Sequence, residues 1–235
     1  MKFVNLLHSL PALAVSALMS GTAAAQVTFD IDAGRRGTAI GDLHYGIFFE
    51  EINHAGDGGL YAELIRNRSF EDNATTPDAW SAVNGAKLSL TSTGLMNDAQ
   101  AKALEVKFAA AGDGVSNTGF WGMNVESGKK YTLSFWAKSD AAFDGKLTAS
   151  LVGADGKSLG STQVAVKAGS KWAKYTAEIT ASASSTAATF NLCSDRSGSL
   201  VLDVVSLFPP TYKNRENGCR IDLAEMLEAM KPSFV

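Results

Sequence analysis

Apolar and polar residues alternate along the middle of this chain, from about residue 69 to residue 208. In YTLSFWAKS (131–139) the side chains alternate strictly, and KLTASLVG, TQVAVKAG, KWAKYTAEIT, ATFNLCS and SLVLDVVSL follow the same style. The segments ESGKK, GADGK and KAGSK supply the turns between them. Short alternating runs about 8–12 residues apart, without helical periodicity, predict a jelly-roll β-sandwich over residues 69–208.

The pattern differs before this region. VTFDIDA (27–33) alternates like a half-exposed strand, whereas LHYGIFFEEI (43–52) is denser in apolar residues, as in a strand covered on both faces of a parallel sheet. After a GDGG bend, LYAELIRN (60–67) has apolar residues at helical spacing. Strand, glycine loop and helix predict the βα start of a parallel α/β architecture within residues 26–68.

The last segment, residues 209–235, begins with a double proline and a polar linker. Asp222 and Glu225 resemble a capping box, and the residues after them predict a helix that Pro232 ends. One face of this helix is apolar and consists of Leu223, Met226, Leu227 and Met230. Because the final SFV resembles the opening of another buried strand, we expect the chain to be a fragment of a longer protein.

Residues 1–25 have the features of a cleavable signal peptide: Lys2, a short apolar stretch and the small residues GTAAA before Gln26. The apolar stretch is shorter than the roughly 20 residues that a spanning helix needs, although an uncleaved anchor is the alternative. We therefore expect a secreted protein, periplasmic or extracellular, with no membrane contact after cleavage.

The charge balance of the mature chain excludes one class of partner. Without Lys2, 20 of the 21 basic side chains remain against 24 acidic ones, a net charge of −4. No basic stripe is present, so nucleic acid is not an expected partner. No cofactor motif is recognised.

The strand-like run 43–52 ends in polar residues that could bind a ligand: Glu50 and Glu51, followed by Asn53 and His54. In parallel α/β folds, functional residues gather where strands end. Neighbouring side chains on a strand point to opposite faces, so Glu50 and Glu51 are not a converging catalytic pair. The alternative is a pair of solvated acids at a loop entrance, with His54 as a loop hydrogen-bonding residue.

The sandwich region contains four tryptophans, of which Trp121 and Trp136 are the candidates for stacking against a sugar ring. Aromatic residues at strand period are more often core than ligand platforms, so both readings stay open for each of them.

Asp203 lies within the apolar run LVLDVVSLF, where an unpaired carboxylate is costly to bury. A backbone hydrogen bond or a structural cation such as calcium could satisfy it, but one carboxylate does not define a metal site. The only two cysteines, Cys193 and Cys219, could form a disulfide if their geometry allows it. They lack histidine partners at zinc-ligand spacing.

Three stretches of the chain point to one family. GIFFEEINHAGDGGLYAELIRNRSFE (46–71) resembles the opening signature of the α-L-arabinofuranosidases of glycoside hydrolase family 51. Residues 205–235 look like that family's entry into its catalytic (β/α)8 TIM barrel. GFWGMNVESGKKYTLSFWAKS (119–139) is similar to the carbohydrate-binding-module-like sandwich, of the family 4/9 type, that some members insert after the first barrel strand.

The resemblance implies a retaining hydrolase that releases terminal α-L-arabinofuranosyl groups from arabinan, arabinoxylan or related plant glycans. By position, Glu50 matches the family's substrate-binding glutamate, and Glu51, Asn53 and His54 would shape the pocket rim. The family's acid/base and nucleophile glutamates lie beyond the point that corresponds to Val235, so the chain alone is expected to be inactive. The main alternative is a non-catalytic, secreted sugar-binding protein. A cell-surface adhesion module would need exposed apolar or repeated features that the sequence lacks.

Overall fold

A computed structural model describes residues 27–235, so the predicted signal peptide at 1–25 lies outside the described residues. The described residues belong to two separate units, 27–41 and 42–235. Residues 27–41 contain neither a helix nor a strand. The predicted strand at 27–33 is therefore wrong: Val27, Phe29 and Ile31 are exposed, and an isolated extended segment has no ladder of hydrogen bonds to hold it.

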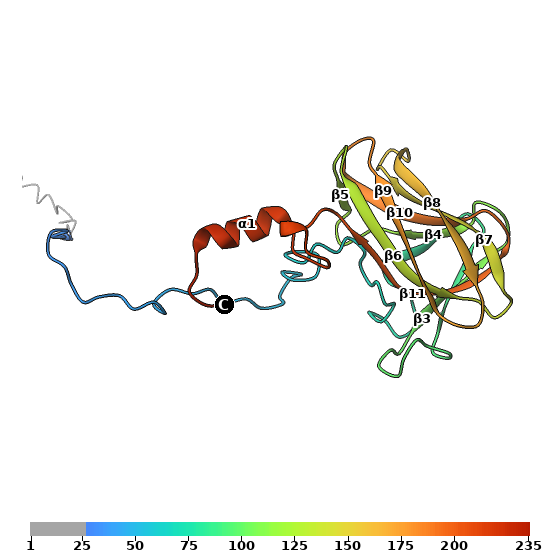
Figure 1. Ribbon diagram of the computed structural model, residues 1–235, viewed down its shortest axis with the longest axis horizontal. Coiled ribbons are helices and arrows are strands. Elements are labelled where there is room, and N and C mark those ends of the chain that lie inside the picture. Colours follow the sequence, from blue (N-terminus) through green and yellow to red (C-terminus); the bar gives the residue numbers. More distant parts are fainter. Residues whose placement is uncertain (1–26) are drawn as a thin grey trace, which may run out of the picture. The chain divides into compact units, whose positions relative to one another are not determined.

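The predicted β-sandwich is confirmed, and it consists of two antiparallel sheets (Figure 1). One sheet has the order β1-β4-β10-β7-β8, with β5 paired to β10, and the other has the order β2-β3-β11-β6-β9. The strands are β1 (Trp80–Val83), β2 (Lys87–Thr91), β3 (Ala103–Phe108), β4 (Gly114–Asn117), β5 (Met123–Val125), β6 (Lys130–Lys138), β7 (Phe143–Val152), β8 (Ser158–Ala168), β9 (Ala173–Thr180), β10 (Ser185–Ser194) and β11 (Gly198–Phe208).

The alternating side chains explain the core between the sheets. On β6, Tyr131, Leu133 and Phe135 are buried, while the residues between them face outward. The longest strands, β7, β8, β10 and β11, contribute further buried aliphatic and aromatic residues. Burial of this apolar surface is the main force that holds the sandwich together.

The predicted helix at 60–67 is wrong, because this segment forms no helix and packs on the sandwich. The amide of Leu64 donates to the carbonyl of Leu207 at 3.0 Å, and the amide of Val205 donates to the carbonyl of Arg68 at 2.9 Å. Ile65 and Phe70 are buried in the sandwich core. Apolar residues at helical spacing therefore do not mark a helix here, since tertiary hydrogen bonds satisfy the backbone instead.

Residues 43–52 form no regular strand, so this predicted strand is also not confirmed. The segment does have a partner at the other end of the chain: the amide of Ser233 donates to the carbonyl of Tyr45 at 2.9 Å, and the amide of Ile47 donates to the carbonyl of Phe234 at 3.1 Å. The partner numbers increase together, so the two segments run in the same direction. Exposed Phe48 shows that the expected two-sided cover is missing here.

The predicted C-terminal helix is confirmed as α1 (Ile221–Met230), after a short 3-10 helix, η1 (Tyr212–Asn214). The predicted capping box is wrong, because Arg220 is the N-cap and Asp222 lies in the first turn, where its carboxylate pairs with the Arg220 guanidinium. Lys231 ends the helix in a left-handed conformation. No helix within residues 27–235 is long and apolar enough to span a membrane.

Candidate functional site

The extended segment after residue 60 is fixed to the sandwich by the buried carboxylate of Glu63. This carboxylate accepts hydrogen bonds from Ser206 Oγ at 2.5 Å and from the amides of Leu207 and Ile65 at 2.8 and 3.0 Å. The guanidinium of Arg68 lies 3.9 Å away. Burial raises the pKa of Glu63, and these donors and the guanidinium oppose the rise. Sequence reasoning missed this residue, although an acid within the apolar run LYAELI was the available signal.

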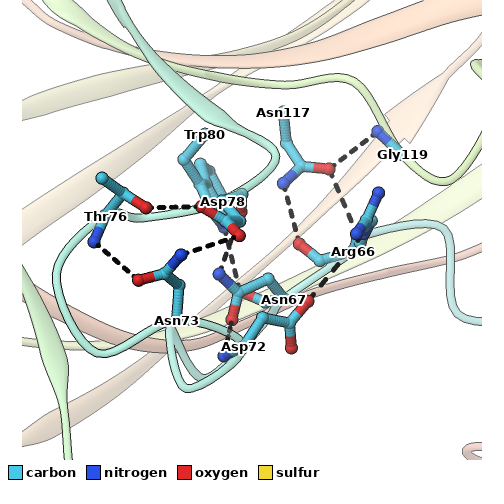
Figure 2. Close-up of polar contacts among 9 residues, drawn as sticks. All are labelled: Arg66, Asn67, Asp72, Asn73, Thr76, Asp78, Trp80, Asn117 and Gly119. Atoms are coloured by element: carbon cyan, nitrogen blue, oxygen red, sulfur yellow. Dashed lines mark hydrogen bonds and ion pairs between the residues drawn. The ribbon is translucent and has the colours of Figure 1, made fainter.

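Two asparagines connect the same segment to the first strands of the sandwich (Figure 2). Asn117, fully buried on β4, donates to the carbonyl of Arg66 at 3.0 Å and accepts from the amide of Gly119 at 2.9 Å. The Asn67 side-chain amide donates to the backbone carbonyl of Asp78 at 2.9 Å, and the backbone carbonyl of Asn67 accepts from the indole N–H of Trp80 at 2.9 Å. These contacts couple residues 66–67 to the turn that begins at Gly119.

The loop after the predicted glutamate pair is closed by Glu51. Its Oε2 atom accepts from the amides of Gly56 and Asp57 at 2.6 and 3.1 Å. Asn53 and His54 both have positive φ angles, 52° and 62°, which turn the chain sharply. Glu51 is therefore engaged in shaping the loop, whereas the Glu50 side chain is exposed.

The structure brings two of the predicted candidates together. The His54 ring packs edge-on against Phe120 and Trp121, with centroid distances of 5.3 and 5.4 Å. Trp121 remains 70% exposed. A cavity of about 530 Å³ lies beside these aromatic residues, between loop 53–59, residues 120–131 and the start of α1. Its size is typical of small-molecule and cofactor sites. We call it the Trp121 cavity.

The other stacking candidate, Trp136, lies in a different place. Thr132, Ser134 and Trp136 alternate on the outward face of β6, and Trp136 is directly opposite Lys174 on β9. These residues, with Thr176 and the linker after Pro209, line a second cavity of about 510 Å³. We call it the Trp136 groove. An aromatic face among hydroxyl and amino groups can bind a polyhydroxylated ligand.

The remaining tryptophans are structural. Trp80 is buried in the core and is held through its indole N–H. The indole of Trp172 donates to the carbonyl of Gly94 at 3.1 Å, and the ammonium of Lys138 lies 5.7 Å from its ring centroid.

Asp203 is fully buried on β11. One of its oxygens accepts from the amide of Val204 at 2.7 Å, and the other has no hydrogen-bond partner. Burial, with a smaller effect from the nearby Glu71 carboxylate, raises the pKa of Asp203 to about 6. Within residues 27–235, no group of three or more His, Cys, Asp or Glu side chains could hold a metal ion.

The two cysteines are free thiols. Cys193 lies on β10 opposite Gly114, and burial raises the pKa of its thiol. Cys219 lies in the linker, where it forms a backbone bridge with Tyr61. The disulfide considered from the sequence is not formed.

The fold is thus a two-sheet antiparallel β-sandwich that has Trp136 on an outward sheet face. The family described as a carbohydrate binding domain matches residues 62–198. The chain belongs to this family.

Its relatives are larger proteins. The chain is 42% identical over 212 residues to an extracellular exo-α-L-arabinofuranosidase of Streptomyces chartreusis, covering 87% of this chain and 25% of that protein. It is 35% identical over 227 residues to α-L-arabinofuranosidase 1 of Arabidopsis thaliana, covering 89% of this chain and 33% of that protein. The chain thus spans a quarter to a third of these relatives.

A solved structure agrees with the sequence comparison. The arabinose-bound α-L-arabinofuranosidase MgGH51 is 33% identical, with a TM-score of 0.76, over 81% of this chain and 33% of that one. The resemblance to family 51 arabinofuranosidases that the sequence motifs indicate, together with the carbohydrate-binding-module-like domain, is therefore confirmed.

Proposed function

We propose that this chain is the N-terminal part of a secreted, retaining α-L-arabinofuranosidase that releases terminal arabinofuranosyl groups from arabinan- or arabinoxylan-type glycans. The similarity to two arabinofuranosidases, of whose length this chain covers a quarter to a third, supports the proposal. In it, residues 1–25 direct secretion, and the acid/base and nucleophile glutamates belong to sequence outside these 235 residues.

The observation that carries the proposal is the pairing of residues 45–47 with residues 233–234. These segments lie on either side of the sandwich in the sequence, yet their backbones are hydrogen-bonded side by side. Insertion of a domain into another fold requires that its chain leave and return at one place, and parallel strands joined by a helix are the unit of a TIM barrel, so this pairing supports the proposal. In this arrangement Glu50 follows the first barrel strand and binds arabinose hydroxyls.

A second candidate function is favoured by the Trp136 groove. An outward aromatic residue among Thr132, Ser134 and Thr176 could bind glycan without cleaving it, as in a non-catalytic sugar-binding protein.

An activity assay tests the proposal. The purified chain should not hydrolyse an aryl α-L-arabinofuranoside, whereas an extended chain that completes the catalytic barrel with both family glutamates should. The extended chain with Glu50→Gln should lose activity mainly through a higher KM, because the hydroxyl contacts of a binding residue are lost. Turnover by the 235-residue chain would contradict the assignment of the chemistry to later sequence. Inactivity of the correctly folded extended chain would favour the non-catalytic binder.

A further inference from the structure

The Trp121 cavity is formed by parts of the chain that are distant in sequence. Loop 53–59 contributes Gly58, the sandwich contributes Phe120 and Trp121, and the helix start contributes Arg220 and Asp222. Gly58 has a φ of 83°, and a Cβ atom there would lie 2.5 Å from the Phe120 ring. The loop thus approaches the aromatic residues closely only because it has no side chain at this position.

The turn that presents Trp121 is rigidly built. Gly119 and Gly122 have φ angles of 65° and 88°, and a Cβ atom on Gly122 would lie 2.9 Å from the Cα atom of Ala187. Asn117 holds the amide of Gly119 and, at the same time, the backbone of Arg66 (Figure 2). A large indole exposed on a fixed turn does not serve the core, and preorganised aromatic surface lowers the entropic cost of binding.

The charges around the cavity restrict the ligand. Lys129 and Arg220 carry positive charge, whereas Glu126, Asp222 and Glu225 carry negative charge. Arg220 is already paired with Asp222, with Nε–Oδ1 at 3.1 Å and Nη2–Oδ2 at 2.5 Å. The net charge of the remaining side chains is therefore negative, which disfavours an acidic ligand. Their carboxylates can also accept hydrogen bonds from hydroxyl groups.

The chain also links this cavity to the segment of Glu50. Loop 53–59 begins directly after the extended segment 43–52, and Glu51 closes it through the amides of Gly56 and Asp57. The loop that follows the proposed arabinose-binding residue therefore leads to His54, which contacts Trp121.

We propose that the Trp121 cavity is a glycan subsite for the neutral sugar residues of the polysaccharide that carries the arabinosyl group, with Trp121 as its stacking platform. This inference rests on the proposed function, because it assigns to the protein a residue that determines specificity for the same substrate. The sandwich then takes part in substrate selection at its junction with the loop, through a surface distinct from the Trp136 groove.

The test uses the whole chain and measures binding of arabinoxylan and arabinan oligosaccharides by calorimetry and tryptophan fluorescence. Trp121→Ala should weaken binding by about tenfold or more, as for an aromatic hot spot, and abolish the ligand-induced fluorescence change. Trp121→Phe should retain part of the affinity. Trp136→Ala tests the Trp136 groove as the competing site. Phe29→Ala is the matched control, because Phe29 is also an exposed aromatic residue but lines neither cavity, and it should leave the affinity unchanged. Polygalacturonate oligosaccharides, which are acidic, should not bind.

The outcomes separate the two proposals. Loss of binding in Trp136→Ala with full binding in Trp121→Ala would overturn the subsite, while carbohydrate binding itself stands. Equal binding of acidic and neutral oligosaccharides would overturn the charge argument and the proposed ligand class. Absence of binding by the folded wild-type chain would overturn the subsite, whereas the activity assay on the extended chain decides the proposed function independently. Since Trp121 is largely exposed, thermal unfolding should show that its variants remain folded.

Discussion

Asp203 shows how one buried group can make the stability of the whole domain depend on pH. Its carboxylate is fully buried, and one oxygen has no hydrogen-bond partner. Its pKa of about 6 lies above its ordinary value of 3.8, so the folded protein holds this proton more tightly than the unfolded chain does. The stabilisation by protonation is full below about pH 4 and is lost as the pH rises through 6.

We therefore expect the contribution of Asp203 to the free energy of unfolding to fall between pH 4 and pH 7, by at most about 3 kcal/mol. Asp203→Asn should remove this slope, because an amide does not titrate. Chemical unfolding at a series of pH values measures it. Asp195→Asn is the control of opposite sign, since backbone and Arg196 donors hold the pKa of Asp195 below its usual range. Identical pH profiles of the wild type and Asp203→Asn would contradict the prediction.

At the scale of the element, the turn between β4 and β5 depends on glycine for two separate reasons. Gly122 has a positive φ of 88°, and a Cβ atom added there would lie 2.9 Å from the Cα atom of Ala187 on β10. Gly156, in the turn between β7 and β8, has a similar φ of 78° but open space around it. Alanine substitutions at these two positions therefore distinguish the energetic cost of a left-handed backbone conformation from the cost of a steric clash.

Gly156→Ala should lower the free energy of unfolding by about 1–2 kcal/mol, the conformational cost of a left-handed residue. Gly122→Ala should cost about 1–3 kcal/mol more, because the added methyl group forces β10 and the turn apart. Urea unfolding of both variants measures the difference. If the two substitutions cost the same, the close approach of the turn to β10 has no energetic consequence.

At the scale of the whole molecule, the sandwich has its own core, whereas its flanks expose apolar surface. Phe48, Met226 and Val235 are 83%, 66% and 82% exposed. Residues 62–70 belong with the sandwich, because Glu63, Asn67 and Phe70 are buried against it. Local stability should follow this division, since regions with few buried contacts open most easily.

Limited proteolysis should therefore cut first within residues 27–59 and 221–235 and leave a resistant core from about residue 60 to residue 208. Mass spectrometry of the products identifies the cut sites. Glu63→Ala should extend cleavage into residues 60–70, because it removes the acceptor of the hydrogen bonds from Ser206, Leu207 and Ile65. Glu178→Ala, at an exposed site on β9, is the matched control. Survival of intact flanks would contradict the predicted division.

The sequence by itself determined the sandwich, because strict alternation of apolar side chains allows only one face of each strand to enter a core. β6 to β11 lie where the six alternating runs predict them, and the helix before Pro232 is also present. The motifs also identified the family from the sequence alone, because each motif is a continuous stretch of chain that can be recognised without the fold.

Only the tertiary structure decided the rest. Residues 60–67 have helical spacing but form no helix, because the backbones of Leu207, Gly218 and Arg220, all distant in sequence, form hydrogen bonds with this segment instead. The roles of Glu63 and Asn117, and the meeting of His54 with Trp121, likewise depend on contacts between segments far apart in sequence. A local pattern records which faces are apolar, but it does not record which distant group will complete a hydrogen bond or a cavity wall.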